Sequence, residues 1–227
     1  MIEKINNIKA CINNEAIACG RSPETIKLVA VSKTKSADMV LKAIKAGITI
    51  FGENYIQEAA DKIKTLSYPN LSWHFIGHLQ TNKAKHAVEL FDLIHTVDSL
   101  KLALELNKHA GKINKVQNIL VQVNIGNESS KSGIHSEKTL ELIKSLSRLE
   151  YVSVKGLMTI PPFFENPEDT RPFFSALRNL KDLIIKETMP HVMINDLSMG
   201  MSNDYKVAIQ EGATFVRIGT AIFGKRH

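Results

Sequence analysis

Short apolar runs alternate along the chain with longer segments in which apolar residues recur every three or four positions. The first such segment, residues 2–19, ends at Gly20 and has the spacing of an amphipathic helix. Eight apolar runs then predict strands, because runs of this length are typical of strands buried on both faces. They span residues 28–33, 48–53, 71–77, 93–97, 119–125, 152–159, 196–201 and 214–218.

Helical segments separate these eight strands, and no linker or change of composition interrupts the alternation. Strands that alternate with helices predict a parallel sheet, and eight such units fit a sheet closed on itself better than an open one. The sequence therefore predicts an α/β fold, a single (β/α)8 TIM barrel with an additional N-terminal helix. We expect one domain over residues 1–227, with residues 1–20 packed on the barrel as that helix.

Composition and charge exclude several classes of function. The 29 basic and 23 acidic residues are intermixed, so the net charge of +6 does not form the basic and aromatic patch of a nucleic-acid-binding protein. No apolar run approaches the roughly 18 residues of a membrane span, and residues 1–4 do not begin a signal peptide. Cys11 and Cys19 lie in one helical segment without partners at metal-ligand spacing. We therefore expect a cytoplasmic, reduced protein.

The first strand ends at Lys33, where the ligand site of a TIM barrel is found. Burial removes water from an ammonium group, lowers its pKa and makes the neutral amine a nucleophile for an aldehyde. In the simpler alternative, Lys33 ends the strand and extends into water. Residues 28–35 alone favour the simpler alternative. Whether Lys33 binds a cofactor therefore has to be judged from the residues at the other strand ends.

The last two strands are followed by glycines and hydroxyl side chains. Gly219 and Thr220 follow the eighth strand, and Ser198, Gly200 and Ser202 follow the seventh. Such loops commonly bind phosphate in barrels of this kind. An aldehyde-reactive lysine combined with a phosphate site several strands away predicts pyridoxal 5′-phosphate (PLP) as the cofactor.

Six blocks, each at a predicted strand end, carry a resemblance to a known family. They are residues 30–35 (AVSKTK), 51–55 (FGENY), 74–83 (HFIGHLQTNK), 131–133 (KSG), 197–202 (LSMGMS) and 216–224 (VRIGTAIFG). The chain resembles the pyridoxal phosphate homeostasis protein family. The resemblance implies a barrel similar to the N-terminal domain of alanine racemase, with PLP held on Lys33 as an internal aldimine. It also implies a regulator or carrier of vitamin B6 rather than an enzyme.

The resemblance further assigns roles to individual side chains. Arg217 is expected to face the pyridine nitrogen and Asn54 to line the ring, while the phosphate is surrounded by Ser198, Ser202, Gly219 and Thr220. An arginine beside the pyridine nitrogen keeps that nitrogen unprotonated and weakens the electron sink that most PLP enzymes use. Lys35 and Lys131 could offer additional amines that make a secondary contact with the cofactor or transfer it.

The main alternative is a PLP-dependent amino-acid racemase or lyase of unknown substrate. Catalysis at Cα requires a proton donor or acceptor on each face of the cofactor, and the sequence offers one clear lysine. Tyr55 and Tyr205 lie near predicted strand ends without an evident partner. The sequence thus favours a non-catalytic monomer that buffers PLP or delivers it, with PLP-dependent apoenzymes as candidate recipients.

A metal site is not predicted. His74 and His78 have the four-residue spacing of a helical metal pair, but they lie across a strand end and a glycine. We expect hydrogen bonding or packing from them instead.

Overall fold

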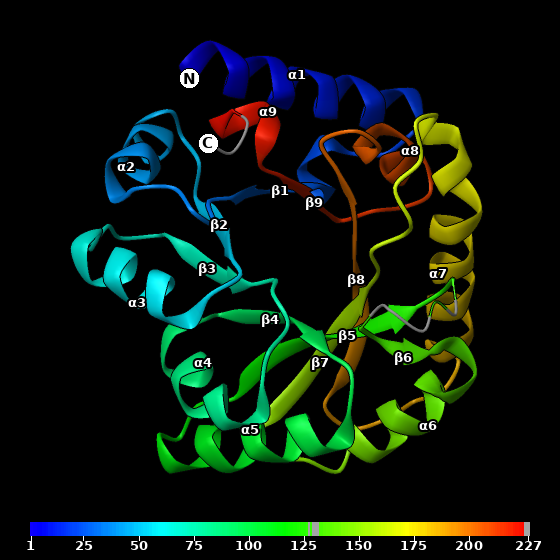
Figure 1. Ribbon diagram of the computed structural model, residues 1–227. Helices are drawn as coiled ribbons and strands as arrows, with labels where there is room; N and C mark the ends of the chain where they lie inside the picture. The colour runs from blue at the N-terminus through cyan, green and yellow to red at the C-terminus, as the bar shows by residue number, and fades with distance from the viewer. Residues whose placement is uncertain (127, 129–131, 225–227) are drawn as a thin grey trace.

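The computed structural model describes residues 1–126, 128 and 132–224 and shows a closed parallel barrel (Figure 1). Each barrel strand pairs with its neighbours in chain order, and β9 closes the ring by pairing with β1. The predicted eight-stranded α/β barrel is therefore confirmed. The barrel strands are β1 (Lys27–Val31), β2 (Ile50–Glu53), β3 (Ser72–Phe75), β4 (Leu93–Val97), β5 (Gln117–Asn124), β7 (Val152–Met158), β8 (Val192–Met201) and β9 (Phe215–Ile218).

Helices surround the strands and follow them in the predicted order (Figure 1). None of them, within the ranges that the structure describes, is long and apolar enough to cross a membrane. The α-helices are α1 (Ile2–Ala18), α2 (Ala37–Lys45), α3 (Ile56–Thr65), α4 (Ala84–Leu90), α5 (Leu100–Lys112), α6 (Ser136–Leu146), α7 (Arg171–Ile184), α8 (Tyr205–Gln210) and α9 (Thr220–Phe223). Short 3₁₀ helices are η1 (Pro23–Thr25), η2 (Thr81–Lys83) and η3 (Pro167–Thr170).

Local sequence explains where several helices begin and which face they bury. Ser36 caps α2 and Ser99 caps α5. The hydroxyl oxygen of each serine accepts a hydrogen bond from the backbone N–H of the residue three positions later, in each case at 3.4 Å. The N-terminal helix α1 packs beside α8 and α9 and buries one apolar stripe, formed by Ile5, Ile8, Ile12 and Ala16. The expected N-terminal helix therefore lies on the outside of the barrel.

Some boundaries differ from the sequence prediction. Strand β1 ends at Val31, so Lys33 lies in a turn rather than on the strand. Strand β8 begins at Val192, four residues before the predicted run. The sequence does not predict this start, because the apolar residues 192–194 form a run of only three and are separated by Asn195 and Asp196 from the apolar residues that follow. The two-residue strand β6 (Ile134–His135) and the four-residue helix α9 were not predicted, since elements this short carry no periodicity.

The apolar core has two parts. A small cluster fills the barrel interior and contains Val29, Leu93, Leu120, Met158 and Phe215. A much larger cluster lies between the strands and the surrounding helices. Strands covered on both sides in this way cannot alternate between polar and apolar residues, which explains the continuous apolar runs.

At one position, strands β7 and β8 lie so close together that only glycine fits. A Cβ built on Gly156 of β7 would lie 1.9 Å from the backbone oxygen of Asp196 on β8. The neighbouring backbone cannot move away without breaking the β7–β8 ladder, in which these two residues are paired. Gly156 therefore permits the close approach of β7 to β8 at this position.

Replacing Gly156 with alanine should lower the free energy of unfolding by about 3 kcal/mol or more, because the added methyl group forces β7 and β8 apart. Gly20→Ala is the matched control. Gly20 has φ +70 with nothing within 4 Å of an added Cβ, so its loss should be only about 1 kcal/mol of backbone strain. Urea denaturation of both variants measures the difference, and equal losses would contradict this account of the barrel.

Candidate functional site

The parallel register brings most of the predicted site residues to one end of the barrel. Val31 of β1 lies opposite Gly52 of β2, and Met201 of β8 lies opposite Arg217 of β9. Because β9 pairs with β1, these four strands are adjacent. The residues that follow the pairs therefore meet at the carboxyl ends of the strands, and they include Lys33, Asn54, Ser202, Gly219 and Thr220.

Lys33 occupies a tight turn at this mouth. Its side chain is half-buried, and the turn closes through a hydrogen bond from the Lys35 backbone N–H to the Ser32 carbonyl at 3.1 Å. Lys35 is also half-buried and lies two residues further along the turn. Lys131, the other residue predicted to make a secondary contact with the cofactor, lies outside the described residues.

A cavity of about 280 Å³ lies at the mouth among β2, β3, β4, β5 and the segment after β7. We call it the mouth cavity, and it is lined by Asn54, Ile76, Gly77, His78, Thr96, Gln122, Ser132 and Ile160. Two buried oxygen atoms, Asn54 Oδ1 and Thr96 Oγ1, have no hydrogen-bond partner among the described residues. Buried polar atoms normally have partners, so this cavity suits a polar ligand.

Arg217 lies below the mouth, inside the barrel. Its guanidinium is fully buried and donates from Nη1 to Ser198 Oγ at 2.6 Å and from Nη2 to the Thr159 carbonyl at 3.0 Å. Burial lowers the pKa of Arg217 to about 10, while Asp204 opposes that shift. The group therefore keeps its positive charge at neutral pH.

A chain of hydrogen bonds continues from Arg217 across the barrel. Ser198 Oγ lies 2.8 Å from His95 Nδ1, and His95 Nε2 lies 3.0 Å from His74 Nδ1. His74 Nε2 then lies 3.1 Å from Ser72 Oγ, which donates to Asp92 Oδ2 at 3.1 Å. We call this the interior polar chain, and its members are Arg217, Ser198, His95, His74, Ser72 and Asp92.

The donors in the interior polar chain can point in only one direction. Ser72 gives its single proton to Asp92, so His74 Nε2 must donate to Ser72. Because burial keeps both histidines neutral, His74 accepts at Nδ1 from His95 Nε2, and His95 accepts at Nδ1 from the Ser198 hydroxyl. The chain therefore runs from a cation to a carboxylate, and every group in it has a defined tautomer or rotamer.

Both histidines in this chain are neutral. Burial is the main cause that lowers the pKa of His74 to about 3, and nearby Lys27 lowers it further. Burial, then His74 and Arg217, depress the pKa of His95 well below its usual range. The hydrogen-bonding role expected of His74 is confirmed, and the described residues contain no group of three His, Cys, Asp or Glu side chains that could hold a metal.

Sequence reasoning missed the role of β4. His95 stands in the middle of an otherwise apolar strand, which is a signal of a buried polar contact. The register of the β4–β5 pairing shifts between Ile94 and Val97. With this irregularity, His95 bonds to Ser198 in the barrel interior while the next residue, Thr96, lines the mouth cavity. The resemblance assigned Ser198 to the phosphate, whereas its buried hydroxyl here contacts Arg217 and His95.

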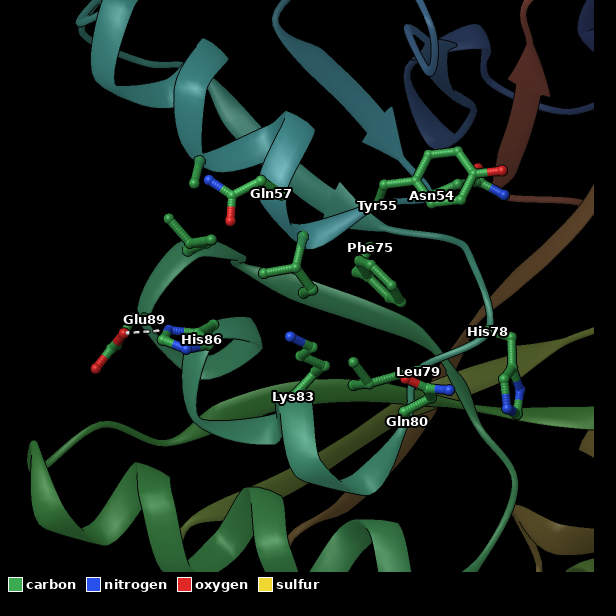
Figure 2. A pocket seen from close by; sticks show the side chains of 13 residues that line it. Asn54, Tyr55, Gln57, Phe75, His78, Leu79, Gln80, Lys83, His86 and Glu89 are labelled. Carbon is green, nitrogen blue, oxygen red and sulfur yellow. Dashed lines mark ion pairs between the residues drawn. The ribbon is translucent and has the colours of Figure 1, made fainter.

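A larger cavity, of about 880 Å³, lies beside the mouth between α3 and α4 (Figure 2). Gln57 of α3 and Lys83 extend into this space, and the ion pair between His86 and Glu89, with 3.4 Å between nitrogen and oxygen, lies on its α4 side. It shares only Asn54 and His78 with the mouth cavity. Among the predicted site residues that the structure describes, Asn54 alone lines either cavity, so the candidate site is placed at the mouth by the strand register, which brings the residues after β1, β8 and β9 together there.

The two tyrosines considered as acid or base groups are not equivalent. Tyr55 is 58% exposed. Burial is the main cause that raises the pKa of Tyr205 to about 12, and the Cys11 thiol, which bonds to it, raises it further. Tyr205 therefore contacts α1 instead of contributing a titrating group to the mouth.

Comparisons with known proteins agree with this geometry. A family model described as "Alanine racemase, N-terminal domain" matches residues 7–227. Pyridoxal phosphate homeostasis proteins of Aquifex aeolicus and Escherichia coli are 44% and 45% identical, over 99% and 95% of this chain and 97% and 92% of theirs. The chain belongs to the pyridoxal phosphate homeostasis protein family. Among solved structures, PipY of Synechococcus elongatus with PLP bound, which is 37% identical, matches with a TM-score of 0.83 over 94% of this chain and all of that one.

The neutral histidines make this family member sensitive to acid. An unfolded histidine has a pKa near 6.5, and the folded values are lower, so below about pH 6.5 the unfolded chain binds more protons. The contribution of these histidines to the free energy of unfolding is therefore fully present above that pH. It falls by roughly 1.4 kcal/mol per histidine per pH unit as the pH drops toward about 3. Between pH 7 and 5.5, urea denaturation should show that His74→Gln loses about 1 kcal/mol less than the parent.

The control for this measurement is His86→Gln on the exposed face of α4. This control should keep the full pH dependence of the parent protein. A His74→Gln variant with undiminished pH dependence would show that His74 is protonated in the folded state.

Proposed function

We propose that this chain binds PLP at the barrel mouth through a covalent bond to Lys33 and takes part in PLP homeostasis. The convergence of Lys33 with the residues after β8 and β9 is the observation that supports this most strongly. The names of the relatives and the PLP-bound structure of PipY support the same cofactor.

The residues present fit the cofactor. An aldehyde needs an amine that is reachable and partly desolvated, and Lys33 is half-buried at the mouth. A phosphate needs hydroxyls and close backbone, which the segments after β8 and β9 offer through Ser202, Gly219 and Thr220. A Cβ on Gly219 would lie 3.3 Å from Val31, so any larger residue would crowd β1. Asn54 Oδ1 supplies an unpartnered acceptor beside the ring position.

The chemistry proposed for the site is a reversible condensation. The neutral amine of Lys33 adds to the aldehyde carbon, and the aldehyde oxygen leaves as water. Arg217 only donates hydrogen bonds, so a pyridine nitrogen facing it has to accept one and stays unprotonated. In this arrangement Ser198 acts on the cofactor through Arg217, which it holds at 2.6 Å.

We further propose that the protein holds and releases PLP without substantial turnover. Arg217 weakens the electron sink, and Tyr205 is engaged with α1 rather than placed across from Lys33. The alternative, an amino-acid racemase or lyase, requires a second acid or base group placed across from Lys33, and His78, which lines the mouth cavity, is the described residue whose part in it the exchange experiment below tests. Delivery to PLP-dependent apoenzymes, a monomeric state and a cytoplasmic location stay predictions.

Borohydride reduction of the protein loaded with PLP should fix the cofactor mass on Lys33, because reduction converts the carbon–nitrogen double bond into a stable single bond. Peptide mass mapping locates the label, and Lys33→Ala should remove it. Label confined to Lys35 or Lys131 would move the primary site to that residue.

The loaded protein should show no sustained exchange of the Cα proton of amino acids for deuterium. Enzymes of this chemistry turn over at roughly 1 s⁻¹ or faster, and NMR in deuterated water with a panel of L- and D-amino acids detects far slower exchange. Multiple-turnover exchange that disappears in Lys33→Ala would establish the enzyme alternative.

A further inference from the structure

The turn that carries Lys33 is held from both sides by helix α3. The Lys62 ammonium donates to the Ser32 carbonyl at 2.7 Å, and the Thr34 backbone N–H donates to Glu58 Oε1 at 2.5 Å. Ser32 and Thr34 are the two residues that flank Lys33. The peptide groups before and after the cofactor-binding candidate are thus both bonded to charged side chains.

The Lys62 ammonium has three donors, and all three are used. Besides Ser32, it bonds to Glu53 Oε1 at 2.8 Å and to Glu58 Oε1 at 2.6 Å. Lys62 is 4% exposed and Glu53 is fully buried. The Ser32 hydroxyl donates to the same Glu53 oxygen at 2.6 Å. A buried ion pair of this kind returns little net stability compared with apolar packing, but it fixes the geometry of the groups it bonds.

The conformation held in this way is strained. Thr34 has φ +63, in the left-handed region that a β-branched residue avoids. Glycine or asparagine would occupy that conformation at lower cost, so threonine keeps it only because neighbouring contacts impose it. The hydrogen bond from Thr34 to Glu58 is the contact that acts directly on this residue.

We propose that Lys62, Glu58 and Glu53 form a clamp that positions the Lys33 amine for condensation with the aldehyde of PLP. The clamp holds Ser32 and Thr34, and thereby sets the direction in which the side chain between them leaves the backbone. Lys62 and Glu58 are positioning residues, because they act through the turn and bond to its backbone. This inference rests on the proposed function, in which Lys33 binds the cofactor.

Glu58→Ala tests the clamp, because it releases Thr34 while leaving the buried Lys62–Glu53 pair in place. PLP is added to the apoprotein, and the absorbance of the protein-bound form is followed with time. Covalent capture should become about tenfold slower, the scale set by the cost of the left-handed conformation. Glu58→Gln should lose less, since its amide oxygen can still accept from Thr34.

Glu105→Ala on α5 is the matched control, because Glu105 also forms a helical ion pair, with Lys108 at 3.1 Å, and is 35% exposed against 26% for Glu58. It should capture PLP at the parent rate. Glu58→Ala should unfold at a lower temperature than this control, because it leaves one donor of the buried Lys62 ammonium without its partner. Capture is therefore measured well below both unfolding transitions, which separates positioning from a general loss of stability.

The double variant Glu58→Ala/Thr34→Asn separates geometry from damage. Asparagine adopts the left-handed conformation more readily than threonine, so capture should return most of the way to the parent rate. A slow double variant would overturn the clamp, as would parent-like capture by Glu58→Ala with the borohydride label still on Lys33. A parent protein that carries no label on Lys33 would overturn the proposed function and the clamp together.

Discussion

A parallel sheet that closes on itself has no edge, and each of its strands is covered by side chains inside and by helices outside. β4 meets this constraint completely, since all five of its residues are buried. Water cannot serve polar groups within such a barrel, so every interior donor or acceptor needs a partner from another strand. Chemistry with a solvent-borne ligand is accordingly confined to the mouth, where the strands end.

The buried guanidinium of Arg217 shows how the barrel meets this requirement. A charge inside the barrel is stable only with partners, and Ser198 and the Thr159 carbonyl take two of its donors. The Ser198 hydroxyl donates its own proton to His95, and hydrogen bonds continue through the two neutral histidines and Ser72 to the Asp92 carboxylate. The buried cation therefore determines side chains on three other strands and the carboxylate that precedes β4.

The sequence predicted the barrel and its mouth because continuous apolar runs and the residues at their ends are local features. The pairings inside the barrel are not local. Ser198 and His95 are 103 residues apart, and no periodicity relates them. The same limit applies to Lys62, whose four-residue spacing from Glu58 on α3 is typical of a solvent-exposed ion pair although its ammonium is buried. The sequence predicts strand as far as Lys33, whereas β1 ends at Val31. The turn that follows contains Thr34 at φ +63, a left-handed conformation that threonine disfavours, so the residue type gives no sign of the turn.

The single direction of the interior polar chain has a consequence for sequence divergence. Ser198, His95 and His74 are buried, and each uses a donor and an acceptor within the chain, so replacing either histidine leaves an unpartnered polar atom on each side. These buried positions therefore cannot change independently. A lineage, or a combinatorial library, that exchanges one histidine for an apolar residue must pass through a destabilised intermediate or change several strands together, and we expect these positions to vary as a set.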